Sequence, residues 1–519
     1  MHFLPISKRN SLQPSAMCLV CFILGLALTM LALTGPPALA KQAEIDLSIL
    51  HVNDTHGHII PYLDKSIDPE RHVGGAEYLA KMVEQERAAN PDGTILLSAG
   101  DMFQGTPISN LFHGKPVIEI MNFLHYDAMA LGNHEFDWGQ HVLQDIIHSA
   151  SFPVVSANIY KGGGHIKGVK PYVILKRKGI RIAVIGLTTP ETRYSTKAEN
   201  VAGLTFENPE KILPSLIRQV KAQGASMVIV LSHDGLDSDR LLARKVRGID
   251  VIVGGHSHTV IKDPVVESGT VIVQAGSNGV YLGVLHVSYN SKSKKIVDYT
   301  SKDELKLVSP SPGSQMDPNV AMIIDKYDTQ VRAEFSKVIG TAAADFTKDR
   351  VRESSLGDLV ADAMRESSGA EIAFQNAGGI RADIQKGPIT LETLFTALPF
   401  DDDLVSMDLA GEKITELLEK TASLEKILQV SGMRIVYDMS DPSRVKLAAV
   451  EVAGNPIDPR KTYRVVTNDF LATSGGAFSV FKQGRNISFG QQQRDAVAGY
   501  IRQNSPISPN VQDRIIFKK

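Results

Sequence analysis

The sequence predicts an α/β fold in two domains, and three observations carry this prediction. The chain has 519 residues, which is more than one hydrophobic core usually serves. Between residues 45 and 308, short β-branched apolar runs alternate with helical stretches, as in layered α/β folds. A linker rich in proline and serine at residues 309–318 then leads to a second region that again mixes helices and strands.

Composition and charge exclude several classes of protein. Hydrophobic residues make up 43% of the chain and charged residues 22%, which is typical of globular proteins rather than of disordered or collagenous ones. The net charge is only −2, so we expect no nucleic-acid partner. Both cysteines, Cys18 and Cys21, lie near the N-terminus, which excludes a disulfide framework and a cysteine-based zinc finger.

The first residues have the order of a secretory signal peptide. Lys8 and Arg9 precede an apolar run at residues 17–33, and the small residues Ala38 and Ala40 frame a cleavage site. We expect a Sec-type signal cleaved after Ala40, a periplasmic or secreted protein, and no stable membrane insertion after cleavage. An uncleaved anchor is the alternative, because the run is long enough to span a bilayer.

The apolar runs of the first region predict strands that are buried on both faces. Each run is apolar throughout instead of alternating with polar residues, so we expect each sheet to be covered on both sides. Helical spacing occurs between the runs at residues 76–88 and 209–222. The predicted strands lie at residues 47–52, 94–97, 128–131, 153–155, 180–186, 227–231, 251–253 and 270–273.

The second region begins after a predicted helix at residues 319–335. It contains predicted helices at residues 356–367, 411–418 and 492–502, and predicted strands at residues 370–374 and 462–467. The chain therefore divides into a signal peptide (1–40), a first domain (41–308), a linker and helix (309–337) and a second domain (338–519). Within the second domain, we expect the acidic run at residues 401–403 to be a solvated loop or the start of a helix.

Side chains that bind metals follow five of the predicted strands. Because the carboxyl ends of parallel strands meet at one edge of a sheet, we expect these side chains to converge there. Any one of them alone could be a cap or a turn residue, but five such strand ends with glycines beside them argue for a site. The residues are Asp54, His56, Asp101, Asn133, His233, His256 and His258.

The chemistry of these seven donors suits a pair of divalent cations. They offer carboxylate, imidazole and amide oxygen but no thiolate, a set that favours Zn²⁺, Mn²⁺ or another borderline ion. One ion cannot use seven ligands, whereas two ions that share a carboxylate need about this number. Asp101 is the natural ligand to bridge the two ions, because it is the single candidate donor that follows the tight turn at Ala99 and Gly100. Such a pair of ions can clamp a phosphoryl group and activate water.

The order and spacing of these residues resemble those of the calcineurin-like metallophosphatases. Five motifs of that family occur here in the same order. They are D-x-H at residues 54–56, G-D at 100–101, G-N-H-[DE] at 132–135, a histidine at 233 and G-H-x-H at 255–258. The fuller strings at residues 53–57 and 132–137 resemble the exported bacterial 5′-nucleotidase and UDP-sugar hydrolase branch. That resemblance implies an N-terminal four-layer α/β/β/α metallophosphatase sandwich, a linker helix and a C-terminal α/β substrate domain.

The resemblance also implies roles for the residues. One ion would receive Asp54, His56, Asp101 and His258, and the other Asp101, Asn133, His233 and His256. His134 and Asp137 resemble the family's catalytic dyad, in which the carboxylate would orient the imidazole and favour its protonated form. For Asp137, the alternative is an acid in the first turn of a helix, placed there by the helix dipole.

Four residues of the second region resemble the family's substrate groups. Arg350 lies in a stretch similar to R-x-R-E-x-x-x-G-[DN]-L, and Asn376 and Arg381 lie in a loop similar to N-x-G-G-I-R. Arg381 could bind phosphate as a bidentate fork, and a solvated hairpin residue is the alternative. Phe478 occupies the position of an aromatic that stacks on the nucleobase, and a core phenylalanine is the alternative.

Three stretches of the second region depart from the family pattern. The family's G-G-D-G before the stacking aromatic reads Ser-Gly-Gly-Ala at residues 474–477. Residues 482–485 lack a carboxylate that relatives carry, and the loop at residues 398–403 looks shortened. We therefore expect recognition of the base or the ribose to differ from that of a standard 5′-nucleotidase.

The function implied by the resemblance is hydrolysis of nucleoside monophosphates to nucleoside and phosphate outside the cytoplasm. Water activated by the metals would attack phosphorus in line, and His134 would assist the leaving alkoxide. A 2′,3′-cyclic nucleotide phosphodiesterase or a UDP-sugar hydrolase on the same centre is one alternative. A periplasmic nucleotide-binding protein without catalysis is another, which the intact His134 and Asp137 pair disfavours because binding alone needs neither residue.

Overall fold

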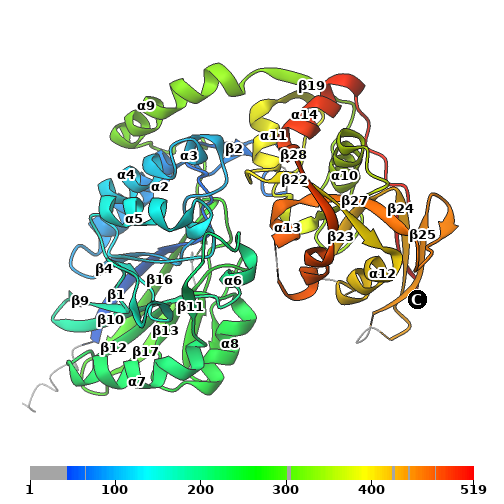
Figure 1. Cartoon of the computed structure of the whole chain (residues 1–519). Helices are drawn as coiled ribbons and strands as arrows, with labels where there is room; N and C mark the ends of the chain where they lie inside the picture. The colour runs from blue at the N-terminus through cyan, green and yellow to red at the C-terminus, as the bar shows by residue number, and fades with distance from the viewer. Residues whose placement is uncertain are drawn as a thin grey trace, which may run out of the picture.

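The protein is described by a computed structural model that covers residues 44–64, 66–300, 305–422, 427–441, 445–473 and 475–518. The predicted signal peptide lies outside these residues. In the part of the chain that is described, no helix combines the length and the apolar character needed to cross a bilayer. Figure 1 shows an N-terminal domain in blue to green and a C-terminal domain in yellow to red, joined by the long helix α9 (Pro318–Phe335).

Two sheets form the centre of the N-terminal domain. The first has the order β17 (Lys295–Thr300), β16 (Tyr281–Asn290), β1 (Glu44–Val52), β4 (Thr94–Ser98), β5 (Ala128–Ala130) and β6 (Val154–Val155), with β18 (Leu305–Leu307) also paired to β16. The second has the order β14 (Val265–Glu267), β15 (Thr270–Val273), β13 (Val251–Gly254), β12 (Met227–His233), β10 (Ile180–Thr188) and β9 (Tyr172–Arg177). The strands that precede the predicted metal donors run parallel within each sheet, so their carboxyl ends share one edge.

The sheets face each other across an apolar core, to which strand β1 contributes Ile49 and strand β12 contributes Leu231. Helices α2 (Ala76–Ala89), α4 (Lys115–Phe123) and α9 cover the outer face of the first sheet. Helices α7 (Pro209–Ala222) and α8 (Leu236–Lys245) cover the outer face of the second. This four-layer α/β/β/α arrangement confirms the expected fold and explains why the strands are apolar on both faces.

The remaining elements of the N-terminal domain are short, apart from helix α5. They are β2 (Tyr62–Leu63), β3 (His72–Val73), α3 (Pro107–Asn110), η1 (His134–Phe136), α5 (Gly139–Ser149), β7 (Ile159–Lys161), β8 (Gly164–His165), α6 (Thr192–Ser195) and β11 (Leu204–Phe206). Strands β7, β8 and β11 form a small antiparallel sheet. The predicted helix before the second domain is α9, which begins where the Asp317 side chain accepts from the N–H groups of Asn319 and Val320.

The C-terminal domain contains a five-stranded sheet and a four-stranded sheet. The first has the order β23 (Leu428–Ser431), β20 (Ile372–Asn376), β27 (Thr462–Asn468), β22 (Asp403–Ala410) and β28 (Arg485–Gln492). The second has the order β26 (Asn455–Pro456), β25 (Lys446–Val452), β24 (Met433–Asp438) and β29 (Ile515–Lys518). Strands β19 (Val338–Ala342) and β21 (Gly387–Thr390) form a separate pair.

The helices of this domain flank its larger sheet. They are α10 (Ser355–Ser368), η2 (Ala377–Gly379), α11 (Leu391–Ala397), α12 (Gly411–Lys420), α13 (Asp469–Thr473), η3 (Gly476–Gln483) and α14 (Gln493–Asn504). Helices α10 and α14 pack on one face through Leu356 and Val497, and helix α12 packs on the other through Ile414.

The structure corrects one expectation for this domain. Within the acidic run at residues 401–403, Asp401 is an exposed loop residue as expected, but Asp402 is only 5% exposed and Asp403 opens strand β22. The main chain of Asp402 accepts a hydrogen bond from the N–H of Gln493, and Lys197 of the N-terminal domain lies opposite its carboxylate. Burial and the neighbouring Asp469 raise the pKa of Asp402 to about 8, so this residue is buried largely in its protonated form beside Lys197.

Candidate active site

The predicted metal donors converge at one edge of the N-terminal sandwich. Asp54 and His56 follow strand β1, Asp101 follows β4, and Asn133 follows β5. From the second sheet, His233 ends strand β12, and His256 and His258 follow β13. The loops after β1 and β4 are joined by hydrogen bonds from the N–H of Asp54 to Gly100 and from the N–H of His56 to Asp101.

Five of these donor residues adopt a left-handed backbone conformation. Their φ angles are 49° for Asp54, 50° for His56, 54° for Asp101, 72° for His256 and 55° for His258. Few residues other than glycine adopt positive φ, and such conformations concentrate at functional sites. Strands β1, β4 and β13 are therefore each followed by a sharp turn that carries donor side chains.

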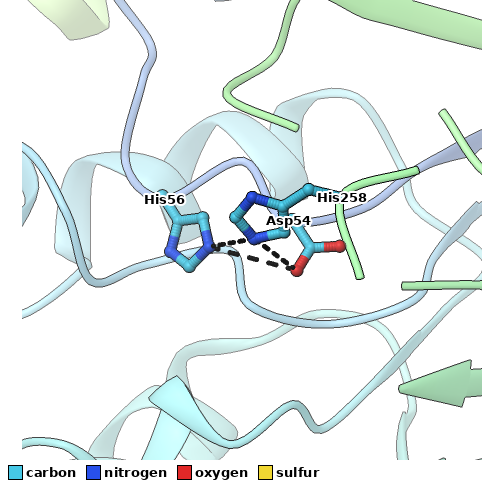
Figure 2. Close-up of side chains that lie close together, drawn as sticks. All are labelled: Asp54, His56 and His258. Atoms are coloured by element: carbon cyan, nitrogen blue, oxygen red, sulfur yellow. Dashed lines mark hydrogen bonds and ion pairs between the residues drawn. The ribbon is translucent and has the colours of Figure 1, made fainter. Parts of the chain in front are cut away.

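Asp54, His56 and His258 form the first group of donors. Figure 2 shows the two imidazole rings and the carboxylate pointing toward a common centre, with His56 Nε2 and His258 Nε2 3.2 Å apart. Asp54 Oδ1 lies 3.3 Å from His258 Nε2 and 4.0 Å from His56 Nε2. Each residue offers one ligand atom, all three within 4.8 Å of one another, so the group could hold a metal ion.

Asp101, His233 and His256 form the second group, again with ligand atoms within 4.8 Å of one another. His233 Nε2 lies 2.9 Å from Asp101 Oδ2. The neighbouring Asn133 is 2% exposed, and its Oδ1 atom is buried without a hydrogen-bond partner in the described structure. A buried amide oxygen without a partner is costly unless a cation or a donor meets it.

Backbone carbonyls orient two of the histidines. His56 Nδ1 lies 2.9 Å from the carbonyl of Gln104, and His233 Nδ1 lies 2.7 Å from the carbonyl of Ala99. A carbonyl can only accept, so each Nδ1 carries the proton and each Nε2 faces the cluster, as in known metal sites. Burial lowers the pKa of His256 to about 4 and holds that of His56 well below its ordinary value. These two residues are therefore neutral, which is the form that binds metals.

Asp101 belongs to the second group and also interacts electrostatically with His56 of the first. Burial alone would raise its pKa, but the surrounding His233, His134 and His56 hold the pKa of Asp101 well below its usual range. The close packing around it explains the adjoining glycine, because a Cβ on Gly132 would lie 2.1 Å from Asp101 Oδ1. Its position fits the bridging role that the sequence predicts.

Glu135, which is not one of the seven predicted metal donors, links the loop after β4 to the loop after β5 by hydrogen bonds. Its carboxylate accepts hydrogen bonds from the backbone N–H groups of Asp101 (2.8 Å), Met102 (2.8 Å) and Gly132 (2.6 Å). Glu135 is 1% exposed, and burial together with Asp101 raises its pKa to about 7. Its side chain thus sets the distance between the loops that carry Asp101 and Asn133.

His134 and Asp137 lie together as predicted. His134 Nδ1 is 2.6 Å from Asp137 Oδ2, and both residues belong to the short turn at η1. Burial opposes ionisation of His134, but the Asp137 and Asp101 carboxylates outweigh it and raise its pKa. Thr196 donates to Asp137 Oδ1 at 2.9 Å, so the carboxylate is held from two sides.

The C-terminal domain closes over this edge and leaves a cleft of about 280 Å³. Arg350, Asn376 and Arg381 line it together with the metal donors, and Arg381 Nη2 lies 3.1 Å from His56 Nε2. Two aromatic rings, Phe400 and Phe470, also line the cleft. The candidate substrate groups of one domain therefore face the donors of the other.

Phe478, the fourth candidate substrate residue, does not line this cleft in the described structure. It belongs to η3 and packs against the core of the C-terminal domain, and it is not among the described residues that line the cleft. Phe400 instead stacks on His134, with ring centroids 5.6 Å apart and an interplanar angle of 30°. Of the four residues in the altered stretch before Phe478, Ser474 lies outside the described residues, and Gly476 begins η3.

Sequence reasoning did not single out Glu135, Thr196 or Lys197 as separate functional residues. Glu135 was part of the motif, but its role depends on three N–H groups that no spacing reveals. Lys197 donates to Asp469 Oδ2 at 2.8 Å and to the carbonyl of Asp401 at 2.9 Å, both in the other domain. Contacts between residues so distant in sequence leave no local signal.

Comparisons with known proteins agree with this architecture. Residues 47–260 match the family model described as calcineurin-like phosphoesterase, and residues 338–483 match that of the 5′-nucleotidase C-terminal domain. The chain is 31% identical to the 5′-nucleotidase of Bos taurus over 91% of each chain. It is 30% identical to the trifunctional nucleotide phosphoesterase YfkN of Bacillus subtilis over 92% of this chain and 35% of that protein.

Comparison with solved structures agrees with the family that the sequence relatives indicate. The structure is similar to that of the 5′-nucleotidase precursor from Thermus thermophilus, with a TM-score of 0.84 and 34% identity over 91% of this chain and 99% of that chain. The sulfate thiohydrolase SoxB of Thermus thermophilus shares the fold, with a TM-score of 0.78 and 19% identity over 91% of this chain and 96% of that chain. The chain therefore belongs to the 5′-nucleotidase family of dinuclear metal-dependent phosphohydrolases, which hydrolyse the phosphate esters of nucleotides.

Proposed function

We propose that this protein is a 5′-nucleotidase that releases phosphate from nucleoside monophosphates in the cleft between its domains. Two divalent ions, Zn²⁺ or Mn²⁺, would be held by the two donor groups. The first ion would use Asp54, His56, Asp101 and His258, and the second Asp101, Asn133, His233 and His256. The observation that carries the proposal is the convergence of these donors, with an otherwise unpartnered Asn133 oxygen, opposite Arg381.

The donor set fits such ions on chemical grounds. Carboxylate, imidazole and amide oxygen suit borderline divalent cations, and the backbone carbonyls behind His56 and His233 hold a proton on Nδ1 and turn Nε2 toward the other donors. Ions bound there would neutralise phosphoryl charge and make water a better nucleophile.

The dyad supplies the proton chemistry. Asp137 holds the His134 imidazole at 2.6 Å and raises its pKa against the effect of burial. A protonated His134 would stabilise the phosphoryl oxygens or give its proton to the oxygen of the leaving nucleoside. Thr196 would keep Asp137 in the orientation that this requires.

The C-terminal domain supplies substrate contacts. Arg381 and Arg350 would bind the phosphate of the substrate, and Asn376 would bind beside them. Phe478 stays our candidate for stacking on the base. The aromatic lining by Phe400 and Phe470 offers a second surface for the base.

The place of action and the domain limits follow from the sequence. A cleaved signal at residues 1–40 would export the protein to the periplasm or beyond the cell. Residues 41–308 and 338–519 would form the two domains, joined by residues 309–337. The nucleotide would then be an extracytoplasmic one, whose phosphate ester is hydrolysed to nucleoside and phosphate.

A substrate panel at fixed metal concentration tests the proposal. Phosphate release is measured from 5′-AMP, 2′,3′-cyclic AMP and UDP-glucose, with Mn²⁺ or Zn²⁺ added. We expect kcat/KM to be highest for 5′-AMP. A preference of tenfold or more for the cyclic diester or the UDP-sugar would replace the 5′-nucleotidase assignment with that activity. Tight binding of 5′-AMP without turnover would identify a binding protein instead.

A further inference from the structure

One loop, residues 255–259, supplies a histidine to each donor group. His258 belongs to the first group and His256 to the second, although only one residue separates them in the chain. Both have positive φ angles, 55° for His258 and 72° for His256. Residues other than glycine keep such a conformation only where the surrounding structure holds them in it. The groups that hold this loop therefore affect both donor groups at once.

Gln274, which directly follows strand β15, holds the loop with its side-chain amide. Its Nε2 donates to the carbonyl of Gly255 at 2.6 Å. Its Oε1 accepts from the Oγ of Ser257 at 2.9 Å and from the N–H of Thr259 at 2.6 Å. These three partners lie before, between and after the two histidines. The amide thus binds every second residue of the loop and leaves the alternate positions to the metal donors.

The amide fixes a loop that core packing alone does not fix. Gln274 is 1% exposed, whereas Ser257 is an exposed residue and the two histidines are half-buried. The loop also has little room to move, because a Cβ on Gly255 would lie 2.9 Å from the carbonyl oxygen of Ala99. A buried side chain that reaches three points of a partly exposed loop determines its shape.

The same segment is linked to Asp54, which follows a strand of the other sheet. Asn53 Oδ1 accepts from the N–H of Ala275 at 2.8 Å. Asn53 Nδ2 donates to the carbonyl of Gly276 at 2.6 Å and to Asp54 Oδ2 at 2.7 Å. Because Gln274 precedes Ala275, a continuous path of hydrogen bonds and main chain runs from the histidine loop to the carboxylate of the first donor group.

We propose that Gln274 is a positioning residue of the metal centre, which sets where His256 and His258 lie relative to each other and to Asp54. It acts through the loop and is not itself a ligand. Its loss would disturb both ion sites, whereas loss of a donor that serves one ion disturbs that site first. This inference rests on the proposed function, from which it takes the two divalent ions.

The test compares Gln274→Met with Gln429→Met. Gln429 is a second buried glutamine whose amide binds main-chain groups, but in the C-terminal domain, where it accepts from the N–H of Ser354 at 3.1 Å. We expect both variants to lose similar thermal stability, since each loses buried hydrogen bonds. In calorimetric titration with Mn²⁺ after chelation, Gln274→Met should bind both ions about tenfold to a hundredfold more weakly. Gln429→Met should stay within twofold of the wild type.

Electron paramagnetic resonance of bound Mn²⁺ gives a measurement that a loss of stability alone does not change. Two ions that share a carboxylate lie about 3.5–4 Å apart, close enough for their spins to couple. At saturating Mn²⁺, we expect a coupled spectrum in the wild type and in Gln429→Met, and a larger share of uncoupled ions in Gln274→Met. Gln274→Glu keeps the shape and the accepting oxygen but loses the donor to Gly255, so it should give an intermediate result, and it replaces Gln274→Met if that variant does not fold.

These measurements need no turnover, so they separate this inference from the proposed function. Affinities and spectra equal to those of the wild type in both Gln274 variants would overturn the inference, as would equal losses in Gln429→Met. If the wild type binds two ions without hydrolysing 5′-AMP, the proposed function fails and weaker binding in Gln274→Met still supports the positioning role. If the wild type hydrolyses 5′-AMP and the Gln274 variants bind both ions normally, only the positioning role fails.

Discussion

Lys197 of the N-terminal domain donates a hydrogen bond to Asp469 of the C-terminal domain at 2.8 Å, at the rim of the first cleft. The preceding residue, Thr196, donates to Asp137 at 2.9 Å. One short loop therefore contacts the dyad carboxylate with one side chain and the opposite domain with the next. We predict that closure of the cleft and orientation of His134 are coupled through these neighbouring residues.

Replacing Lys197 tests this coupling. Lys197→Met removes the cation that faces Asp469 and the buried Asp402, whose pKa burial and Asp469 raise to about 8. We expect KM for 5′-AMP to rise about threefold to tenfold, because the closed arrangement loses a charge-assisted hydrogen bond. Steady-state kinetics measure the effect. Lys413→Met, on the exposed face of helix α12, is the control, and equal kinetics for both variants would refute the coupling.

Glu135 gives a second prediction. In Glu135→Gln, one of the two accepting oxygens becomes an NH₂ group, so the side chain can no longer accept either from Met102 or from Asp101 and Gly132. We expect bound metal and kcat/KM to fall about tenfold to a hundredfold, as for other residues that orient metal ligands. Metal analysis alongside kinetics measures both quantities. Full metal content with normal turnover would show that Glu135 does not position the loops.

The dyad gives a third prediction. His134→Ala should lower kcat by about 10²–10⁴ with metal content unchanged, because the imidazole acts on substrate rather than on the ions. Asp137→Asn should lower kcat less, since it removes the orienting charge and leaves the ring in place. If metal is lost together with the His134 side chain, the residue is a ligand and the assignment is wrong.

Much of the fold could be read from the sequence because burial leaves a clear pattern. The apolar runs predict β1, β4, β10, β12 and β13 to within a few residues, and the predicted helices at 209–222 and 319–335 correspond to α7 and α9. The donors could be predicted because each follows a strand, and parallel strands bring their ends together whatever the loops between them do.

The features that the sequence could not predict are side-chain positions that depend on contacts between distant parts of the chain. The buried Asp402 lies beside Lys197, which is more than two hundred residues earlier in the chain. The stacking of Phe400 on His134 likewise joins two domains. The position of Phe478 was inferred from a motif, yet packing against the C-terminal core decides where its ring lies. Side-chain partners of this kind are set by docking geometry, which local spacing does not encode.

The most direct test of the two-metal account is a metal titration of the chelated protein, with bound metal and hydrolysis of 5′-AMP followed together. The account predicts no activity after chelation, two ions bound per chain at saturation, and activity that returns as the second ion binds. Asp101→Asn should bind fewer than two ions and remain inactive, because we propose that its carboxylate is shared by both ions. Full activity after chelation, or full activity with one ion per chain, would contradict the account.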